Sequence, residues 1–271
     1  MNKLFQPVQV GSLTLKNSIV FAPTSVGREG LDFYEKIAKG GASLIILPDI
    51  SVIPSMLGAP SLGSLQYADY FRKVVEICHR YDCKVSVQLF HPEYDVDYIG
   101  SLYRQRGKIS SDEVHRLLAE NMMGYADTLT AEQADAIVEK FAAAARNARE
   151  VGVDMIQIHG DRLIGSFSSA LFNHRTDRYA PHTAFAEAVV KAVRAAVPEM
   201  PLDYKLTIRT EEPKLGRGGA LISEVPEFLE VLEAAGVDAF HVAIANHSNI
   251  RDTIPAANHP LLQGEGCFTH L

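Results

Sequence analysis

Three side chains that can move a proton or carry a charge follow one apolar segment of the sequence within four residues. Residues 154–158 alternate and lead directly into His159, Asp161 and Arg162. The alternation predicts a buried β-strand, and Gly152 marks the end of a helix before it. In a repeating β/α chain, ligands are met just past the carboxyl ends of the strands. Packing alone does not explain an imidazole, a carboxylate and a guanidinium at that edge, so we predict the active site here.

The composition is that of one large folded unit. The 271 residues are 47% hydrophobic, and no change of composition divides the chain, so we expect a single domain over residues 1–271. The net charge is −7, and Lys and Arg form no block, which argues against nucleic acid or an anionic membrane as the main partner. No apolar run approaches the roughly 20 residues of a membrane span, and the first residues do not resemble a secretory signal.

Cysteine usage and short motifs narrow the class further. Cys78, Cys83 and Cys267 are odd in number and scattered, so they form neither a disulfide framework nor a CxxC site. We therefore expect free thiols in a cytoplasmic protein. No zinc, P-loop or dinucleotide-binding fingerprint occurs, which argues against a metal hydrolase and against a Rossmann dehydrogenase.

Strand and helix patterns alternate along the chain after a small hairpin predicted over residues 7–15. We expect strands at residues 18–22, 43–47, 85–90, 154–158, 202–208 and 238–244, and helices at residues 31–39, 67–81, 130–150, 183–197 and 223–235. The strands are mostly apolar on both faces, as is typical of parallel strands covered by helices. Six β/α units in series favour an α/β fold of the TIM-type (β/α)8 barrel over an open sheet.

Two regions depart from a regular, closed barrel. After residue 244 the chain offers no further strand pattern, so we expect a barrel that is truncated after about six units and lacks strands seven and eight. Residues 93–129 are longer than an ordinary loop, and we predict an irregular lid or pocket wall there.

Several short motifs occur in an order that is specific when they are taken together. They are Leu-Phe-Gln-Pro-Val at 4–8, Ala-Pro at 22–23, Lys-Gly-Gly-Ala at 39–42, Val-Gln-Leu-Phe-His at 87–91, Ile-His-Gly at 158–160 and Asn-His-Arg-Thr-Asp-Arg-Tyr at 173–179. The series resembles the old yellow enzyme family of FMN-dependent ene-reductases over residues 4 to about 245. The resemblance implies FMN as cofactor. The sequence does not disclose the electron donor, and NADH, NADPH or a flavodoxin-like protein would each be compatible.

The resemblance also implies which residues hold the flavin. Pro23, Thr24 and Ser25 would lie beside the isoalloxazine, with Ser25 near N5 and O4. Gln88 would pair with the O2/N3 edge, whose donor and acceptor an amide can match. Lys205 falls where the family usually has an arginine near N1 and O2, and a cation there would stabilise the reduced, anionic flavin. Without a flavin, Gln88 would be an amide bonded to backbone, and Lys205 would belong to an ion pair at the core edge.

The motif after the fourth strand departs from the common family pattern. Family members commonly carry a second His or Asn three residues after the first, and then a Tyr that donates a proton. Here the run is His-Gly-Asp-Arg, and the Tyr has no evident counterpart. This run resembles the bilirubin reductase branch of the family, which is implied to reduce the methine bridges of bilirubin toward urobilinogen.

A linear tetrapyrrole substrate would give these side chains distinct tasks. Its propionates and lactam carbonyls suit a guanidinium, so we expect Arg162 to orient and polarise it. Arg162 is a poor acid, and Asp161, or a water that it holds, would relay the proton. Burial would help Asp161 to keep a proton, whereas the neighbouring guanidinium favours its ionised form. His159 would hydrogen-bond a carbonyl or the flavin edge.

Alternative interpretations stay open at this point. Asp161 and Arg162 would otherwise be an ion pair on a surface loop, and His159 a core histidine. Arg175 and Asp177 are expected to form a structural pair that pins a loop. Aromatic and histidine side chains elsewhere are assigned either to a pocket or to packing; they are Tyr94, Tyr98, Tyr103, His91 and His241.

Two other functions compete with bilirubin reduction. The first is an ene-reductase that acts on another activated alkene, such as an enone or enoate. The second is a truncated, non-catalytic relative that has lost its flavin and binds a pigment or a protein partner. Absorbance near roughly 450 nm, the band of an oxidised flavin cofactor, would separate the second from the two enzymes.

Overall fold

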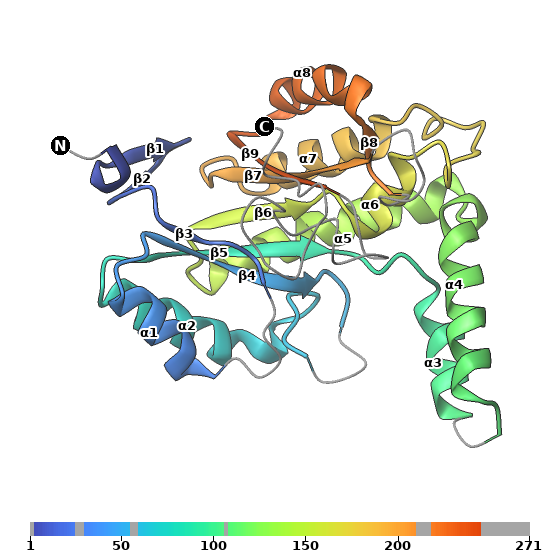
Figure 1. Cartoon of the computed structure of the whole chain (residues 1–271), viewed down its shortest axis with the longest axis horizontal. Helices are drawn as coiled ribbons and strands as arrows, with labels where there is room; N and C mark the ends of the chain where they lie inside the picture. Colours follow the sequence, from blue (N-terminus) through green and yellow to red (C-terminus); the bar gives the residue numbers. More distant parts are fainter. Residues whose placement is uncertain (1–2, 25–29, 55–58, 106–107, 210–217, 245–271) are drawn as a thin grey trace, which may run out of the picture.

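The computed structural model of the chain describes residues 3–24, 30–54, 59–105, 108–209 and 218–244. Its main sheet is parallel, with the strand order β3, β4, β5, β6, β7, and with β8 and β9 both pairing with β7. The strands are Val20–Phe21, Leu44–Ser51, Lys84–Phe90, Met155–His159, Leu202–Arg209, Ala220–Leu221 and Ala239–Ile244, in the order β3 to β9. Together they form a half-barrel surrounded by helices (Figure 1). The predicted α/β fold is confirmed.

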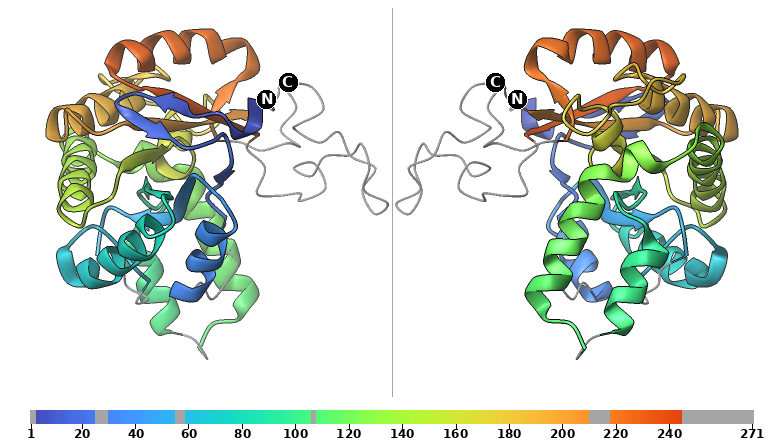
Figure 2. Two further views of the ribbon diagram at one scale, coloured as in Figure 1. Left: turned by 90° about the vertical axis from the view of Figure 1, so that its left-hand side faces the viewer. Right: turned by 90° about the vertical axis from the view of Figure 1, so that its right-hand side faces the viewer.

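Helices cover the outer face of this half-barrel (Figure 2). They are α1 (Leu31–Lys39), α2 (Ala68–His79), α5 (Ala131–Glu150), α7 (Ala184–Ala196) and α8 (Val225–Ala235). The predicted hairpin is confirmed as the antiparallel pair β1 (Val8–Val10) and β2 (Leu13–Leu15). Thr130 and Gln133 form a capping box at the start of α5, which explains why the sequence marked that helix so clearly.

Residues 93–129 are largely helical, so the prediction of an irregular section is wrong. They form α3 (Val96–Arg104) and α4 (Ser111–Thr128), two helices that project from the carboxyl-end side of the sheet (Figure 1). The 18-residue α4 buries only Val114 and Ala126. A helix with so little buried surface has a weak apolar period, which is why the pattern in the sequence was missed.

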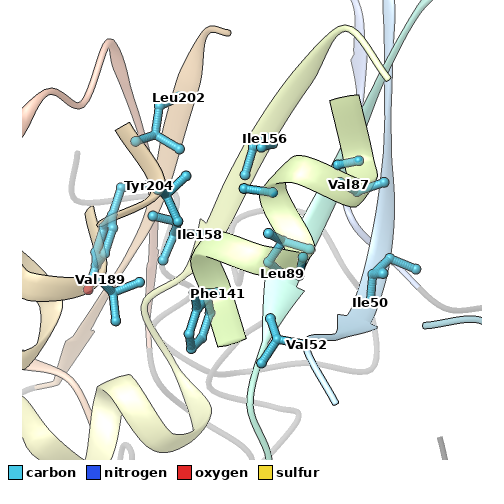
Figure 3. Packing of buried hydrophobic residues seen from close by; sticks show 14 of the residues in the cluster. Ile50, Val52, Val87, Leu89, Phe141, Ile156, Ile158, Val189, Leu202 and Tyr204 are labelled. Atoms are coloured by element: carbon cyan, nitrogen blue, oxygen red, sulfur yellow. The ribbon is translucent and has the colours of Figure 1, made fainter. Parts of the chain in front are cut away.

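The main hydrophobic core lies between the outer face of the sheet and its helices. Alternate residues of the central strands point into it and are almost fully buried (Figure 3); they are Val87, Leu89, Ile156, Ile158, Leu202 and Tyr204. They pack against Phe141 of α5 and Val189 of α7. Burying one such aliphatic side chain contributes about 1.5–3 kcal/mol, so this layer holds the strands in the register that positions the site.

The inner face of the sheet is polar at its centre, which corrects the expectation of strands that are apolar on both faces. Gln88, Gln157 and Asp203 lie on neighbouring strands and are buried. The Gln88 amide donates a hydrogen bond to Gln157 Oε1 (2.6 Å), and the Gln157 amide donates one to the Asp203 carboxylate. These hydrogen bonds satisfy groups that would be costly to bury unpaired.

Of these three buried polar side chains, Asp203 is the one whose burial lowers the stability of the fold. Burial raises its pKa from 3.8 to about 6, against the hydrogen bond from Gln157. A carboxyl group with a raised folded-state pKa binds its proton more tightly in the folded state than in the unfolded state. Its penalty is absent below pH 3.8, grows up to about pH 6 and is fully present at pH 7.

We therefore expect Asp203→Asn to raise the free energy of unfolding at pH 7 by about 1–3 kcal/mol, because one pKa unit corresponds to about 1.4 kcal/mol. The asparagine keeps an acceptor for Gln157 and has no charge to bury. The gain should shrink toward zero near pH 4. Urea denaturation at both pH values measures this, with Asp69→Asn at an exposed position as control. A variant that is less stable than the parent protein at pH 7 would contradict the prediction.

The half-barrel has two open edges in the part of the chain that the structure describes. There β3 pairs with β4 alone, and β9 pairs with β7 alone. Residues 245–271 lie outside the described ranges, so the predicted lack of strands seven and eight stays a prediction. Among the described helices, none is both long enough and apolar enough to cross a membrane.

Candidate active site

The motif that follows β6 makes a tight turn from strand to helix. His159 ends β6, and α6 (Arg162–Phe167) begins three residues later. Gly160 lies against β7, where its N–H donates a hydrogen bond to the carbonyl of Lys205 (3.0 Å). A Cβ atom at Gly160 would lie 2.4 Å from that carbonyl oxygen. Glycine therefore lets the turn sit directly on the neighbouring strand.

Arg162 and Asp49 face each other across the carboxyl edge of the sheet. Both have a left-handed backbone, with φ of +57° and +48°. Residues other than glycine rarely adopt this conformation, which costs on the order of 1–3 kcal/mol and occurs most often at functional sites. The Arg162 Nη2 atom is 3.6 Å from Asp49 Oδ2, and Nη1 is 3.6 Å from Glu93 Oε1.

The guanidinium of Arg162 is held in place without using all its donors. Nε is buried, and no described residue accepts a hydrogen bond from it. Burial alone would lower the pKa of Arg162, but Asp49, Asp161 and Glu93 together raise it above its ordinary value. The side chain is thus a fixed cation with a donor left over for a carbonyl or carboxylate.

His159 also lies close to the Asp49 carboxylate. Its side chain is buried, and Nε2 is 3.7 Å from Asp49 Oδ1. The backbone N–H of Asp161 donates to His159 Nδ1 (3.4 Å), so in the neutral ring Nε2 carries the proton and faces Asp49. The structure therefore brings His159 and Arg162 to one shared carboxylate, rather than placing His159 in the apolar core.

Asp161 is buried, with 7% of its surface exposed, so the alternative of a surface ion pair is wrong for this residue. Its Oδ1 lies 3.2 Å and 3.5 Å from the positions that Cβ atoms would take at Gly165 and Gly218. Gly219 closes the same region, since its N–H donates to the carbonyl of Gly165 (2.8 Å). The carboxylate thus lies between α6 and the segment that leads into β8.

A cavity of about 430 Å³ opens beside Asp49, the residue that faces Arg162. Its walls come from residues at and after the end of β4, from the end of β5 and from α3. Tyr94 and Tyr103 line it, whereas Tyr98 is 39% exposed and lies outside its wall. His91 is buried with Nδ1 2.8 Å from the carbonyl oxygen of Pro92, and it does not line the cavity. The volume falls in the range of roughly 300–1,000 Å³ that small-molecule sites occupy.

Sequence reasoning missed three residues of this site: Asp49, Glu93 and Gln157. Asp49 and Glu93 each follow the carboxyl end of a predicted strand, at 43–47 and 85–90. That position was the available signal, because ligand-facing side chains of parallel sheets gather there. In the described ranges, no group of three or more His, Cys, Asp or Glu side chains is arranged to hold a metal ion.

The structural pair predicted at Arg175 and Asp177 is confirmed. Arg175 Nε donates to Asp177 Oδ1 (3.0 Å), and Nη1 donates to the carbonyls of Ala126 (2.6 Å) and Leu129 (2.5 Å). The loop after α6 is thereby pinned to the junction of α4 and α5. His241 lies on the inner face of β9, 3.4 Å from Gln157 Nε2, and burial lowers its pKa to about 4.

A comparison with protein families identifies the enzyme family of this chain. The model of the NADH:flavin oxidoreductase / NADH oxidase family matches residues 3–263. The chain belongs to this family. The old yellow enzyme resemblance seen in the motifs is confirmed, and the family uses FMN together with NAD(P)H.

Two curated relatives are similar over nearly the whole chain. A bilirubin reductase of Clostridium symbiosum (strain WAL-14163) is 40% identical over 98% of this chain and 74% of the relative. A bilirubin reductase of Mediterraneibacter gnavus (strain CC55_001C) is 39% identical over 94% of this chain, which spans 41% of that relative. Among solved structures, the Old Yellow Enzyme from Pichia sp. AKU4542 superposes with a TM-score of 0.70 at 23% identity, over 91% of this chain and 72% of that one. That likeness shows the barrel fold.

Gln88 has the free hydrogen-bonding groups that the family resemblance requires at the edge of an FMN ring. The Gln88 amide donates one hydrogen bond to Gln157 and accepts one from the N–H of Asp49 (3.4 Å). A side-chain amide has two donor hydrogens and two acceptor lone pairs. One donor and one acceptor are left, which is what the O2/N3 edge of a flavin requires. The alternative of an amide fully used by the backbone is not what the structure shows.

Lys205 is the cation that the family resemblance assigns to the N1/O2 side of the ring. It lies on the inner face of β7, in register with His159 and His241 on the neighbouring strands. Burial lowers the pKa of Lys205, while Asp161 and Asp49 act in the opposite direction. With the described residues it forms no ion pair within 4 Å, so the alternative of an ion pair at the core edge finds no support. Pro23 and Thr24 follow β3, and Ser25 lies outside the described residues.

Proposed function

We propose that this chain reduces the methine-bridge double bonds of bilirubin toward urobilinogen, using FMN. The observation that carries the proposal is the guanidinium of Arg162, held between Asp49 and Glu93 with a buried Nε that has no acceptor among the described residues. Two bilirubin reductases, each about two fifths identical to this chain, support a tetrapyrrole as the substrate. The absence of the usual proton-donating Tyr from the motif favours it over a simple enone or enoate.

The cofactor would be held at the inner carboxyl edge of the half-barrel, in a single FMN-binding domain. Gln88 would pair with O2 and N3, and Lys205 would lie near N1 and O2. Pro23, Thr24 and Ser25 would lie beside the ring, at the end of β3. When bound, FMN supplies a hydride from N5 to an electron-poor bridge carbon.

The remaining side chains position the substrate and manage its proton. Arg162 binds a lactam carbonyl or a propionate and polarises the conjugated system. His159 offers Nε2–H to a carbonyl or to the flavin edge. Asp161, or a water that it holds, relays the proton to the carbon next to the one that receives hydride. The proton itself comes from solvent, which resupplies Asp161 or the water that it holds after each turnover, while the hydride comes from the reduced cofactor.

An anaerobic titration tests the proposal. Protein with FMN and NADH is mixed with bilirubin, and the bilirubin absorbance band is followed with time. We expect the band to disappear only when protein and FMN are both present, and Asp161→Asn to slow the loss by about 100-fold, the size of a general acid–base contribution. NADPH and a reduced flavodoxin are compared as electron sources. Bilirubin that persists with every donor, while a simple enone reoxidises the flavin, would show a general ene-reductase instead.

A further inference from the structure

Helix α3 presents one face to the 430 Å³ cavity along its whole length. The lining residues of α3 recur at intervals of one, three and four positions, which places them on one side of a helix; they are Val96, Ile99, Gly100, Tyr103 and Arg104. The facing wall comes from the segment at and after the end of β4, including Ser51, Ile53 and Pro60. The cavity is therefore a channel between α3 and this segment.

The channel runs outward from the active-site edge. Its inner end is marked by Asp49, whose carboxylate lies 3.6 Å from the Arg162 guanidinium. Val96 lies four residues beyond Pro92 at the end of β5, so α3 starts near that edge. Arg104 lies eight residues further along the helix, about 12 Å away at roughly 1.5 Å per residue. Figure 1 shows α3 leading away from the sheet in this direction.

The charges of the channel stand at its two ends. Among the described residues that line it, Asp49 and Arg104 are charged, and most of the others are aliphatic or aromatic. Arg104 is exposed and pairs with no carboxylate of a described residue within 4 Å, whereas Arg116 on the adjacent α4 is paired with Glu113 and Glu120. A guanidinium at the outer end of an apolar channel suits a long apolar molecule that carries a carboxylate at a distance from its reacting bond.

We propose that this channel binds the part of the substrate that lies away from the reacting double bond, and that Arg104 binds one of its propionate carboxylates. The inference rests on the proposed function, because it assigns a contact to the same tetrapyrrole. The ring system would lie between Tyr94 and Tyr103 and the apolar wall after β4. Arg104 would thus select for substrates with a free carboxylate, while Arg162 acts at the reacting bond.

The test compares bilirubin with its neutral dimethyl ester, in the FMN-loaded protein. Arg104→Gln should raise KM for bilirubin about threefold to fivefold, the effect of one exposed ion pair, and leave kcat nearly unchanged. The KM for the ester should not move. Arg104→Lys should restore part of the affinity, since it keeps the charge and loses the planar fork. Arg116→Gln, on the same helical hairpin, is the matched control and should behave as the parent protein.

Two measurements separate failure of this inference from failure of the proposed function. Binding of bilirubin is followed in parallel by the circular dichroism induced in the bound pigment, which needs no turnover. Binding that weakens in Arg104→Gln, without turnover in the parent protein, would support the channel and overturn the proposed reaction. Equal KM for bilirubin in Arg104→Gln and the parent, or equal increases for bilirubin and the ester, would overturn the role of Arg104 while the reductase activity stands.

Discussion

Replacing Arg162 by alanine is expected to lower kcat/KM for bilirubin by about 100-fold or more. The guanidinium is a partly buried cation between Asp49 and Glu93, and no described residue accepts a hydrogen bond from its buried Nε. Removing one member of a buried, charge-paired group typically costs about 2–5 kcal/mol, and about 1.4 kcal/mol corresponds to a factor of ten. Steady-state kinetics with bilirubin as the variable substrate measures the effect.

Three further variants isolate the role of the side chain. Arg162→Lys keeps the charge and loses the bidentate geometry, so we expect a loss of about tenfold. Arg162→Gly removes the same side chain as the alanine variant but relieves the strained backbone, so it should be the more stable of the two and equally inactive. Arg72→Ala, at an exposed pair on α2, should leave activity unchanged. An alanine variant within about threefold of the parent activity would exclude Arg162 from the transition state.

Replacing Phe167 by alanine is expected to lower the free energy of unfolding by about 3–5 kcal/mol, the usual cost of truncating a fully buried phenylalanine. Phe167 is stacked on Phe185, with ring centroids 4.0 Å apart, and meets Tyr179 edge-on at 6.0 Å. The Arg175 guanidinium lies 5.4 Å from its ring centroid. This one side chain therefore joins α6 to α7 and to the loop that Arg175 pins.

Denaturant unfolding followed by circular dichroism measures the loss of stability. Phe167→Leu keeps most of the volume and should cost clearly less than the alanine variant. Phe5→Ala, at a side chain that is 63% exposed, should change stability by less than about 0.5 kcal/mol. Because Phe167 ends the short helix that Arg162 begins, the alanine variant should also lose bilirubin turnover at temperatures where it is still folded. A loss of stability below about 1 kcal/mol would show that α6 is held by other contacts.

The elements of the barrel could be predicted because each has a local cause. The strand at 154–158 ends at the chemically active motif, Gly152 and Gly236 adopt the positive φ that ends the helices before two strands, and Thr130 caps α5. Where the local signal was weak, the prediction was wrong: α4 buries few side chains and gave no clear period. The polar inner face was missed for another reason. A strand with both polar and apolar residues does not indicate which side chains of neighbouring strands will hydrogen-bond to its polar ones.

Local periodicity and motifs in a fixed order were enough to predict the α/β barrel, the flavin-enzyme family and the place of His159, Asp161 and Arg162 at the end of a strand. The neighbours of these three residues follow only from how the chain folds in three dimensions. Asp49 and Glu93 come from other strand ends, and Arg104 lies at the end of α3, a helix that was not predicted. Such neighbours are set by how parallel strands align their carboxyl ends and by where the following helix packs, and no spacing along the chain encodes that distance.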